Sequence, residues 1–146
     1  MNLLGKKEEL PGTEIKGRLI KEYNKDFLNY IESPENGFNM IKKIYFKITD
    51  VESINKIYNV IKKWKINNTN FKIPLYKSDG NSIIIYLCSQ KFAWTVGPQM
   101  IENKKNKKEW IDKTFTIKFD VKSYNFPSQK TIEGLQFIIK YIDLEI

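Results

Sequence analysis

The sequence predicts a mainly β protein, a small barrel of five strands with one main helix between the second and third strands. Short apolar runs separated by turn signals predict the strands, and several of these runs alternate apolar and polar residues with period two. One segment alone, after residue 49, changes to helical spacing. The 146 residues suit a single domain, 1–146, in which residues 1–11 form a loose N-terminal arm.

The first two strands are expected at 13–23 and 39–48. Gly17 interrupts the first and predicts a bulge or bend there. In the second strand, three apolar residues alternate with two lysines and a tyrosine. The polar face of this strand carries Lys43, Tyr45 and Lys47. One side of the strand is therefore expected in the core and the other in water.

A capping box predicts the start of the helix, with Thr49 at the N-cap and Glu52 three residues later. Apolar residues then recur at helical spacing as far as Trp64, and lysines fill the last turn, where cations suit the helix dipole. Two asparagines after the lysines end the helix. Its apolar stripe is expected to face the core.

The next strand is a nearly continuous apolar run at 83–88, which favours burial on both faces, and it continues to Trp94. The polar segment 102–112 is predicted to be a loop, either a mobile basic finger or an ordinary solvated surface loop. Its lysines are Lys104, Lys105, Lys107 and Lys108. Trp110 beside them is expected to anchor the segment in the core.

The last third of the chain predicts the final two strands, 114–122 and 135–146. The first of these alternates strictly and runs on into 123–127 before a turn. If the register holds, two rings and two lysines share its polar side. They are Lys118, Lys122, Tyr124 and Phe126. This order of strands, with one helix, matches an OB fold, a barrel that binds oligonucleotides across its second and third strands.

The composition excludes several kinds of site. The chain has no histidine and a single cysteine, Cys88, so it contains no zinc finger, no Ser–His or Cys–His pair and no internal disulfide. No glycine-rich phosphate loop occurs. We therefore expect no enzyme, no metal and no cofactor. The sequence shows neither a signal peptide nor a stretch of membrane-spanning length, which predicts an intracellular soluble protein without membrane contact.

The charge favours a polyanionic partner. Lysine and arginine number 25 against 17 acidic residues, a net charge of +8. Eighteen lysines but only seven acidic residues lie between Asn39 and Lys130, the part that also holds the predicted aromatic faces. Rings interleaved with lysines suit a single strand with exposed bases. The expected stacking residues are Tyr45, Trp94, Tyr124 and Phe126, and the expected phosphate contacts are Lys43, Lys47, Lys91, Lys118 and Lys122.

Four stretches share their order and pattern with one known family: 43–50 with the helix that follows, 75–86, 115–126 and 134–145. Together they resemble the short single-stranded DNA-binding proteins of short-tailed phages. The third stretch ends, as in that family, in two aromatic residues separated by one residue, Tyr124 and Phe126. The similarity covers about residues 39–146 and rests on order and pattern rather than on an invariant motif.

The resemblance implies an OB fold that coats single strands cooperatively in viral DNA replication or recombination, without catalysis. By position, it implies stacking by Tyr124 and Phe126 and phosphate contacts by Lys118 and Lys122. Family members commonly carry an acidic C-terminal tail that recruits replication proteins. This sequence stops at Ile146, directly after its last strand, which leaves open whether such a tail is absent or was removed, and with it recruitment and dimerisation through the tail. A homodimer and replication partners are left open.

Two other functions also fit the sequence. One is an inhibitor that binds a host nucleic-acid-processing or defence enzyme, which would have little affinity for free oligonucleotides. The other is an RNA-binding module of the same fold, which competition between DNA and RNA of one sequence would identify. A nuclease that holds its metal with Asp and Glu alone is also left open.

Overall fold

The computed structural model describes residues 12–32, 43–64, 71–88, 95–126 and 132–145. Within them, strands outweigh helices, as the sequence predicts. The elements in chain order are β1 (Thr13–Leu19), α1 (Lys25–Glu32), β2 (Lys43–Ile48), α2 (Val51–Lys62), β3 (Leu75–Lys77), β4 (Ile83–Cys88), β5 (Thr95–Val96), α3 (Pro98–Glu102), the 3-10 helix η4 (Lys104–Trp110), β6 (Thr114–Phe126) and β7 (Ile132–Leu144).

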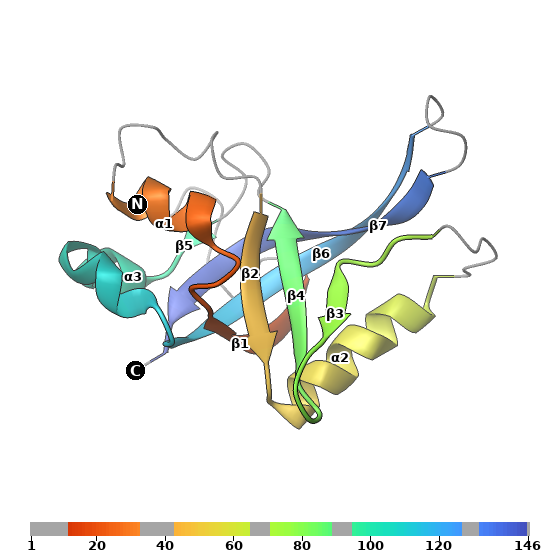
Figure 1. Ribbon diagram of the computed structural model, residues 1–146, viewed down its shortest axis with the longest axis horizontal. Helices are drawn as coiled ribbons and strands as arrows, with labels where there is room; N and C mark the ends of the chain where they lie inside the picture. Colours follow the sequence, from red (N-terminus) through yellow and green to blue (C-terminus); the bar gives the residue numbers. More distant parts are fainter. Residues whose placement is uncertain (1–11, 33–42, 65–70, 89–94, 127–131, 146) are drawn as a thin grey trace.

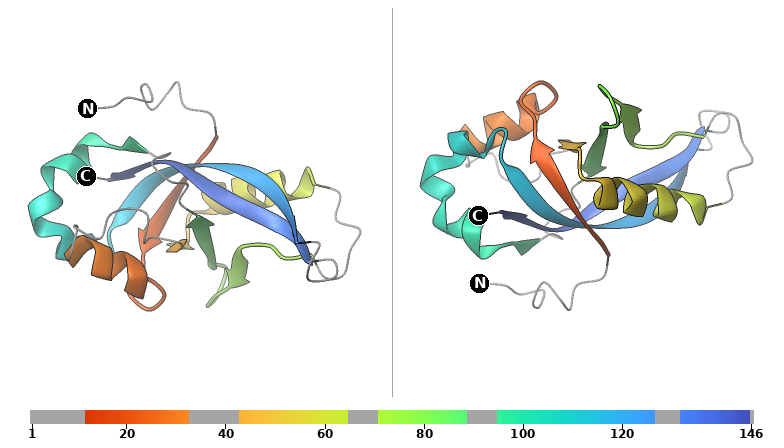
Figure 2. Two further views of the ribbon diagram at one scale, coloured as in Figure 1. Left: turned by 90° about the horizontal axis from the view of Figure 1, so that it is seen from above. Right: turned by 90° about the horizontal axis from the view of Figure 1, so that it is seen from below.

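The strands of the described ranges form one seven-stranded sheet in the order β3-β4-β2-β1-β6-β7-β5. β4 also pairs with β7, in parallel, where Cys88 lies opposite Ile138. β2 and β4 run side by side, and the β6–β7 ribbon passes behind them and projects beyond the other strands (Figure 1). The views from above and below show how strongly this ribbon curves (Figure 2). Two short strands, β3 and β5, join the sheet in addition to the five strands that the sequence predicts.

The alternation that predicts β2 and β6 is confirmed by burial. Ile44, Phe46 and Ile48 are fully buried, while Lys43 on the same strand is exposed. On β6 the inward residues Phe115, Ile117 and Phe119 are likewise fully buried. The core therefore lies between the inward faces of the strands, where these residues join the apolar residues of β1, β4 and β7.

Gly17 is needed for close packing rather than for a bulge. The register between β1 and β6 runs without a shift from Thr13 to Arg18. A Cβ at Gly17 would come within 2.7 Å of Ile48 Cδ1 and 2.9 Å of Phe46 Cβ. Glycine thus lets β1 cross closely over the buried side chains of β2, and the predicted bulge is wrong.

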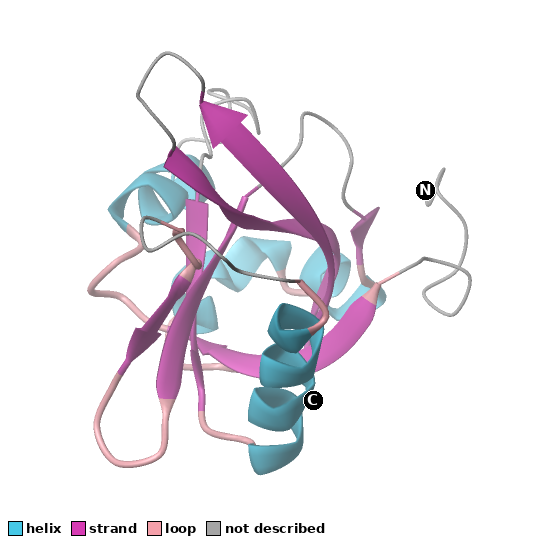
Figure 3. Ribbon diagram, turned by 90° about the vertical axis from the view of Figure 1, so that its right-hand side faces the viewer, coloured by secondary structure: helices cyan, strands magenta, loops and turns pink. Residues whose placement is uncertain are grey.

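The start of α2 differs by one residue from the capping box that the sequence predicts. Asp50, not Thr49, is the N-cap, and its Oδ2 accepts hydrogen bonds from Ser53 N at 3.0 Å and Ser53 Oγ at 2.6 Å. These bonds hold the pKa of Asp50 below its usual value. Ser53 Oγ also accepts from Lys16 N at 2.9 Å, which ties the helix to β1. Figure 3 shows α2 in front, with the other helices behind the sheet.

The prediction of one main helix missed the helices at the opposite end of the molecule. Segment 102–112, expected as a loop, is largely helical, since α3 ends at Glu102 and η4 follows. Pro98 starts α3, and the buried Asp143 caps it by accepting from Met100 N at 3.0 Å. Trp110 is 6 % exposed, which confirms its expected role as an anchor.

Candidate nucleic-acid interface

Two tyrosines form the centre of an aromatic cluster on the outer side of the sheet. Tyr45 of β2 lies directly opposite Tyr86 of β4 in the antiparallel register. Their ring centroids are 5.4 Å apart, with the planes inclined at 47°. Residues directly opposite in an antiparallel pair have side chains on the same face, and β2 buries Ile44 and Phe46 on its other side.

One further ring adjoins each side of this pair. Tyr23, between β1 and α1, stacks on Tyr45 with centroids 5.5 Å apart and planes inclined at 29°. The ring centroid of Tyr76, on β3, lies 6.0 Å from that of Tyr86. Tyr23 and Tyr76 are 50 % and 51 % exposed, so both ends of the cluster present aromatic surface to water. We call these four residues the tyrosine row; it crosses β3, β4 and β2 and ends before α1.

The buried side chain of Asn24 holds the β2 end of the tyrosine row. β1 pairs with β2 only through Arg18 and Leu19, so no strand of the described ranges pairs with the backbone of Tyr45 on that side. Asn24 takes this place: its Nδ2 donates to Tyr45 O at 2.8 Å, and its Oδ1 accepts from Tyr45 N at 2.8 Å. Both polar groups of the Tyr45 backbone are thereby paired, and the adjacent Tyr23 is brought over the Tyr45 ring.

Two lysines flank Tyr45 on the outer face of β2. Lys43 and Lys47 lie two residues to either side of it and therefore share its face. The Nζ of Lys43 lies over the Tyr86 ring, 4.6 Å from the centroid. Arg18 lies opposite Lys47 on the neighbouring strand β1 and is exposed. Positive charge thus adjoins the tyrosine row along β2 and β1.

The central phenols of the row stay neutral well above physiological pH. Burial raises the pKa of Tyr86 to about 12, with smaller contributions from Tyr76 and Tyr124. Burial also raises the pKa of Tyr45. The rings of Tyr45 and Tyr86 therefore carry no negative charge that would repel a phosphate.

Tyr124 of β6 approaches the same cluster from the projecting ribbon. It lies opposite Gly134 of β7, and a Cβ on that glycine would lie 2.5 Å from the Tyr124 hydroxyl and 2.7 Å from Lys72 O. Burial and then the neighbouring Cys88 raise the pKa of Tyr124, and Tyr124 in turn contributes to the raised pKa of Tyr86. Tyr124, which the sequence predicts as a stacking residue, thus lies near the β4 part of the tyrosine row.

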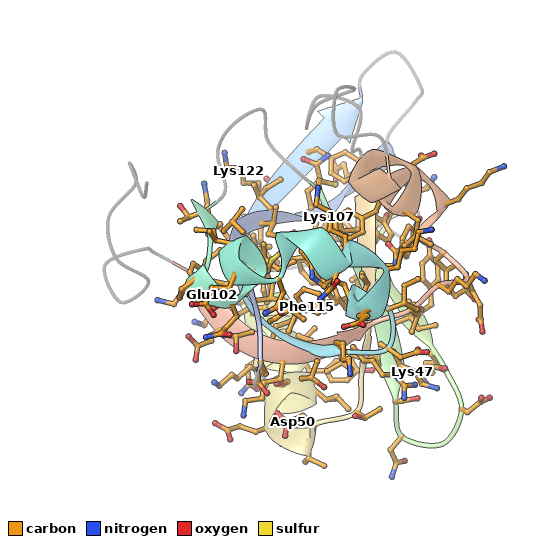
Figure 4. All side chains as sticks on the ribbon, turned by 90° about the vertical axis from the view of Figure 1, so that its left-hand side faces the viewer. Lys47, Asp50, Glu102, Lys107, Phe115 and Lys122 are labelled. Atoms are coloured by element: carbon orange, nitrogen blue, oxygen red, sulfur yellow. The ribbon has the colours of Figure 1, made fainter. Side chains whose placement is uncertain are left out.

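The other described lysines that the sequence predicts as phosphate contacts lie on β6, which carries none of the four rings of the tyrosine row. Lys118 pairs in register with Glu14 of β1 and Tyr141 of β7, at a shift in the β6–β7 register. Lys122 lies on the ribbon, and Figure 4 shows it well separated from Lys47. The phosphate contacts expected from the sequence therefore divide into a β2 pair beside the row and a separate β6 pair.

The remaining predicted residues lie on other elements or outside the described residues. Lys91 and Trp94 fall outside the described residues. Phe126 ends β6, but its side chain is not described, and the same holds for Lys104 and Lys105 of η4. The rest of the basic segment, Lys107 and Lys108, lies on η4, which packs against α1 rather than on the β2–β4 face.

Sequence reasoning missed three of the four tyrosines in the row. Tyr86 lies in the apolar run of β4, which was expected to be covered on both faces. Ile83, Ile84, Ile85 and Leu87 are buried, whereas Tyr86 is only half-buried. A tyrosine after three isoleucines, at a strand position that faces outward, was the signal that could have identified Tyr86. Tyr23 and Tyr76 carried no such local signal, because long-range pairing places them.

A hollow lies at the end of the molecule formed by α3 and η4. It has a volume of about 260 Å³ and is lined by Gln99, Asn103, Asn106, Glu109, Trp110, Lys113, Leu144 and Glu145. The charged side chains of this lining are Glu109, Lys113 and Glu145. Within the described ranges, no group of three or more His, Cys, Asp or Glu could hold a metal ion.

Comparison of the chain with protein-family models, with curated proteins and with solved structures finds no match. None of the helices in the described ranges has the length and apolar character needed to cross a membrane. The function of the chain therefore has to be inferred from its own residues and their geometry.

Proposed function

We propose that this chain is an OB-type barrel that binds single-stranded DNA with little sequence preference. The strand pairings support the barrel. β1 pairs with β2, β2 with β4, β4 with β7, β7 with β6, and β6 with β1, so these five strands are linked in a ring. α2 follows the second strand of that ring, where the sequence predicts the main helix.

The tyrosine row is the observation that carries the proposed binding. Its four rings cross the outer face of β2 and β4, the second and third strands of the ring. Stacking of a base on an aromatic side chain contributes about 1–3 kcal/mol and tolerates every base, because each base has a π face. Two of the rings, Tyr23 and Tyr76, are half-exposed before any ligand binds, so they can receive a base directly.

The charges beside the row support a polyanionic ligand. Lys43 and Lys47 on β2 lie within the same face as Tyr45, and the chain as a whole carries a net charge of +8. Each phosphate that these lysines neutralise contributes about 0.7 to the slope of log affinity against log salt on a single strand. We propose that the protein coats unpaired strands during DNA replication or recombination and catalyses no reaction.

The test is binding of fluorescent oligo(dT) by the wild type and three variants at about 50 and 200 mM salt. Tyr45→Ala and Tyr86→Ala should each weaken binding, whereas Tyr58→Ala should not, because Tyr58 lies on α2 outside the row. Thermal unfolding checks that each variant is folded. The absence of wild-type binding at the lower salt would overturn the proposal.

Competition with oligo(U) distinguishes DNA from RNA as the preferred ligand. Equal or stronger binding of the RNA would replace DNA by RNA in the proposal while leaving the tyrosine row as the site. Binding of neither polymer would favour the alternative of a protein-binding inhibitor.

A further inference from the structure

One lysine occupies the surface on which a base would stack. Lys43 lies opposite Cys88 in the β2–β4 register, so Tyr86 is its diagonal neighbour on the same face. The Nζ of Lys43 lies over the Tyr86 ring at 4.6 Å from its centroid, within the range of a cation–π interaction. A base cannot lie flat on this side of the ring while the ammonium group is there.

The coverage distinguishes the centre of the tyrosine row from its ends. Tyr23 and Tyr76 are about half exposed, whereas Tyr86 is flanked by Tyr45 on one side and Tyr76 on the other and carries Lys43 on its face. Two neighbouring rings and one ammonium group thus surround this half-buried ring. Moving Lys43 is therefore the way for Tyr86 to gain a base without any change in the sheet.

We propose that Lys43 gates Tyr86. The ammonium group of Lys43 leaves the Tyr86 ring only when a backbone phosphate replaces the ring as the partner of that ammonium group. The uncovered ring then accepts a base. This inference rests on the proposed single-strand binding and adds a specificity to it. A polymer with charged linkages can compensate Lys43 for the lost ring contact, but a neutral aromatic ligand cannot. The gate therefore selects nucleic-acid strands over uncharged aromatic molecules.

Lys47 provides a matched control for this role. It lies on the same strand and the same face as Lys43, on the other side of Tyr45, and makes no ring contact with any described residue. Removal of its charge should weaken phosphate binding as removal of Lys43 does. It should not uncover a ring.

The experiment compares two oligothymidylates of equal length, about 12 nucleotides, one with phosphodiester and one with uncharged methylphosphonate linkages. Lys43→Ala and Lys47→Ala remove both the charge and the stem, so that no long side chain at position 43 can cover the ring. Both variants should bind the phosphodiester strand more weakly than the wild type. On the methylphosphonate strand, Lys43→Ala should bind about two- to fivefold more tightly than the wild type, the range of a cation–π contact, and Lys47→Ala should be unchanged.

Failure of the gate and failure of the proposed function give different results. If the wild type binds the phosphodiester strand but Lys43→Ala gains nothing on the methylphosphonate strand, the gate is overturned and single-strand binding stands. If the wild type binds neither strand, the proposed function and the gate are both overturned. Lys43 is exposed, so its substitution leaves the core intact, and thermal unfolding of both variants verifies this.

Discussion

The carboxamide of Asn24 pairs with both backbone groups of Tyr45. Nδ2 donates to the carbonyl oxygen and Oδ1 accepts from the N–H, each at 2.8 Å. A side chain thus completes the hydrogen bonding of β2 where β1 has ended. Asn24 also starts α1, since its carbonyl oxygen accepts from Leu28 N at 2.8 Å. One residue therefore fixes the helix, the strand and the first two rings of the tyrosine row.

The first prediction follows from this pairing. Asn24→Ala should lower the free energy of unfolding by roughly 1–3 kcal/mol, because the backbone groups of Tyr45 lose their partners. It should also weaken oligo(dT) binding, because Tyr23 and Tyr45 are no longer held together. Urea denaturation measures the first effect. Asn59→Ala, at an exposed position of α2, is the control and should change little. Equal stability of the two variants would contradict the role of Asn24.

The second prediction concerns the exposed ends of the row. Tyr23→Ala and Tyr76→Ala should each weaken oligo(dT) binding by about 1–3 kcal/mol, the contribution of one stacked base. Both rings are half-exposed, so the melting temperature should change little. Fluorescence anisotropy titrations measure the affinity. Tyr76→Phe keeps the ring and should bind as the wild type does; a loss as large as that of Tyr76→Ala would mean that the hydroxyl group, and not stacking, is responsible.

The third prediction tests the contact between Tyr124 and Gly134. A Cβ on Gly134 would lie 2.5 Å from the Tyr124 hydroxyl and 2.7 Å from Lys72 O. Gly134→Ala should therefore destabilise the protein and displace the Tyr124 ring. Adding Tyr124→Ala should recover part of the loss, since one of the two clashes is removed, and a double-mutant cycle of unfolding free energies measures this coupling. Strictly additive effects would show that the two residues do not meet.

The fourth prediction is a loss of stability at alkaline pH. Tyr86 has a folded pKa of about 12, above the value of about 10 for an unfolded tyrosine. The folded state therefore holds the proton more tightly, and the stability linked to it is fully present below pH 10 and decreases as the pH rises towards 12. Denaturation across this range should give a shallower decrease for Tyr86→Phe. The same slope in both proteins would exclude Tyr86 as its source.

The fifth prediction separates the two candidate caps of α2. Asp50→Ala should cost roughly 0.5–2 kcal/mol of stability, whereas Thr49→Ala should cost little, because Asp50 is the residue that binds Ser53. The pKa of Asp50 is lowered in the fold. Its contribution is thus present above the unfolded pKa and is lost as the pH falls through the folded pKa. Urea denaturation near neutral and acid pH measures both effects, and a larger cost for Thr49→Ala would reverse the assignment.

Local patterns in the sequence were sufficient to predict several elements. The alternation in β2 and β6 predicts which residues are buried, because a strand turns successive side chains to opposite faces whatever its partners are. The helical spacing of apolar residues after Asp50 predicts α2, because a helix brings residues at that spacing to one face. The short helices α3 and η4 were harder to predict. They depend on the anchor Trp110 and on Asp143, which caps α3 by accepting a hydrogen bond from a backbone N–H 43 residues earlier in the chain.

The sequence by itself determined that the chain is basic, mainly β, and carries an outward strand face with Lys43, Tyr45 and Lys47. Only the tertiary structure decided which rings meet. Tyr23, Tyr76 and Tyr86 come from three different segments, and the pairing of β2 with β4 and β4 with β3, together with Asn24, brings them into one row. Periodicity is a property of neighbouring residues, whereas the tyrosine row depends on contacts between residues far apart in the chain.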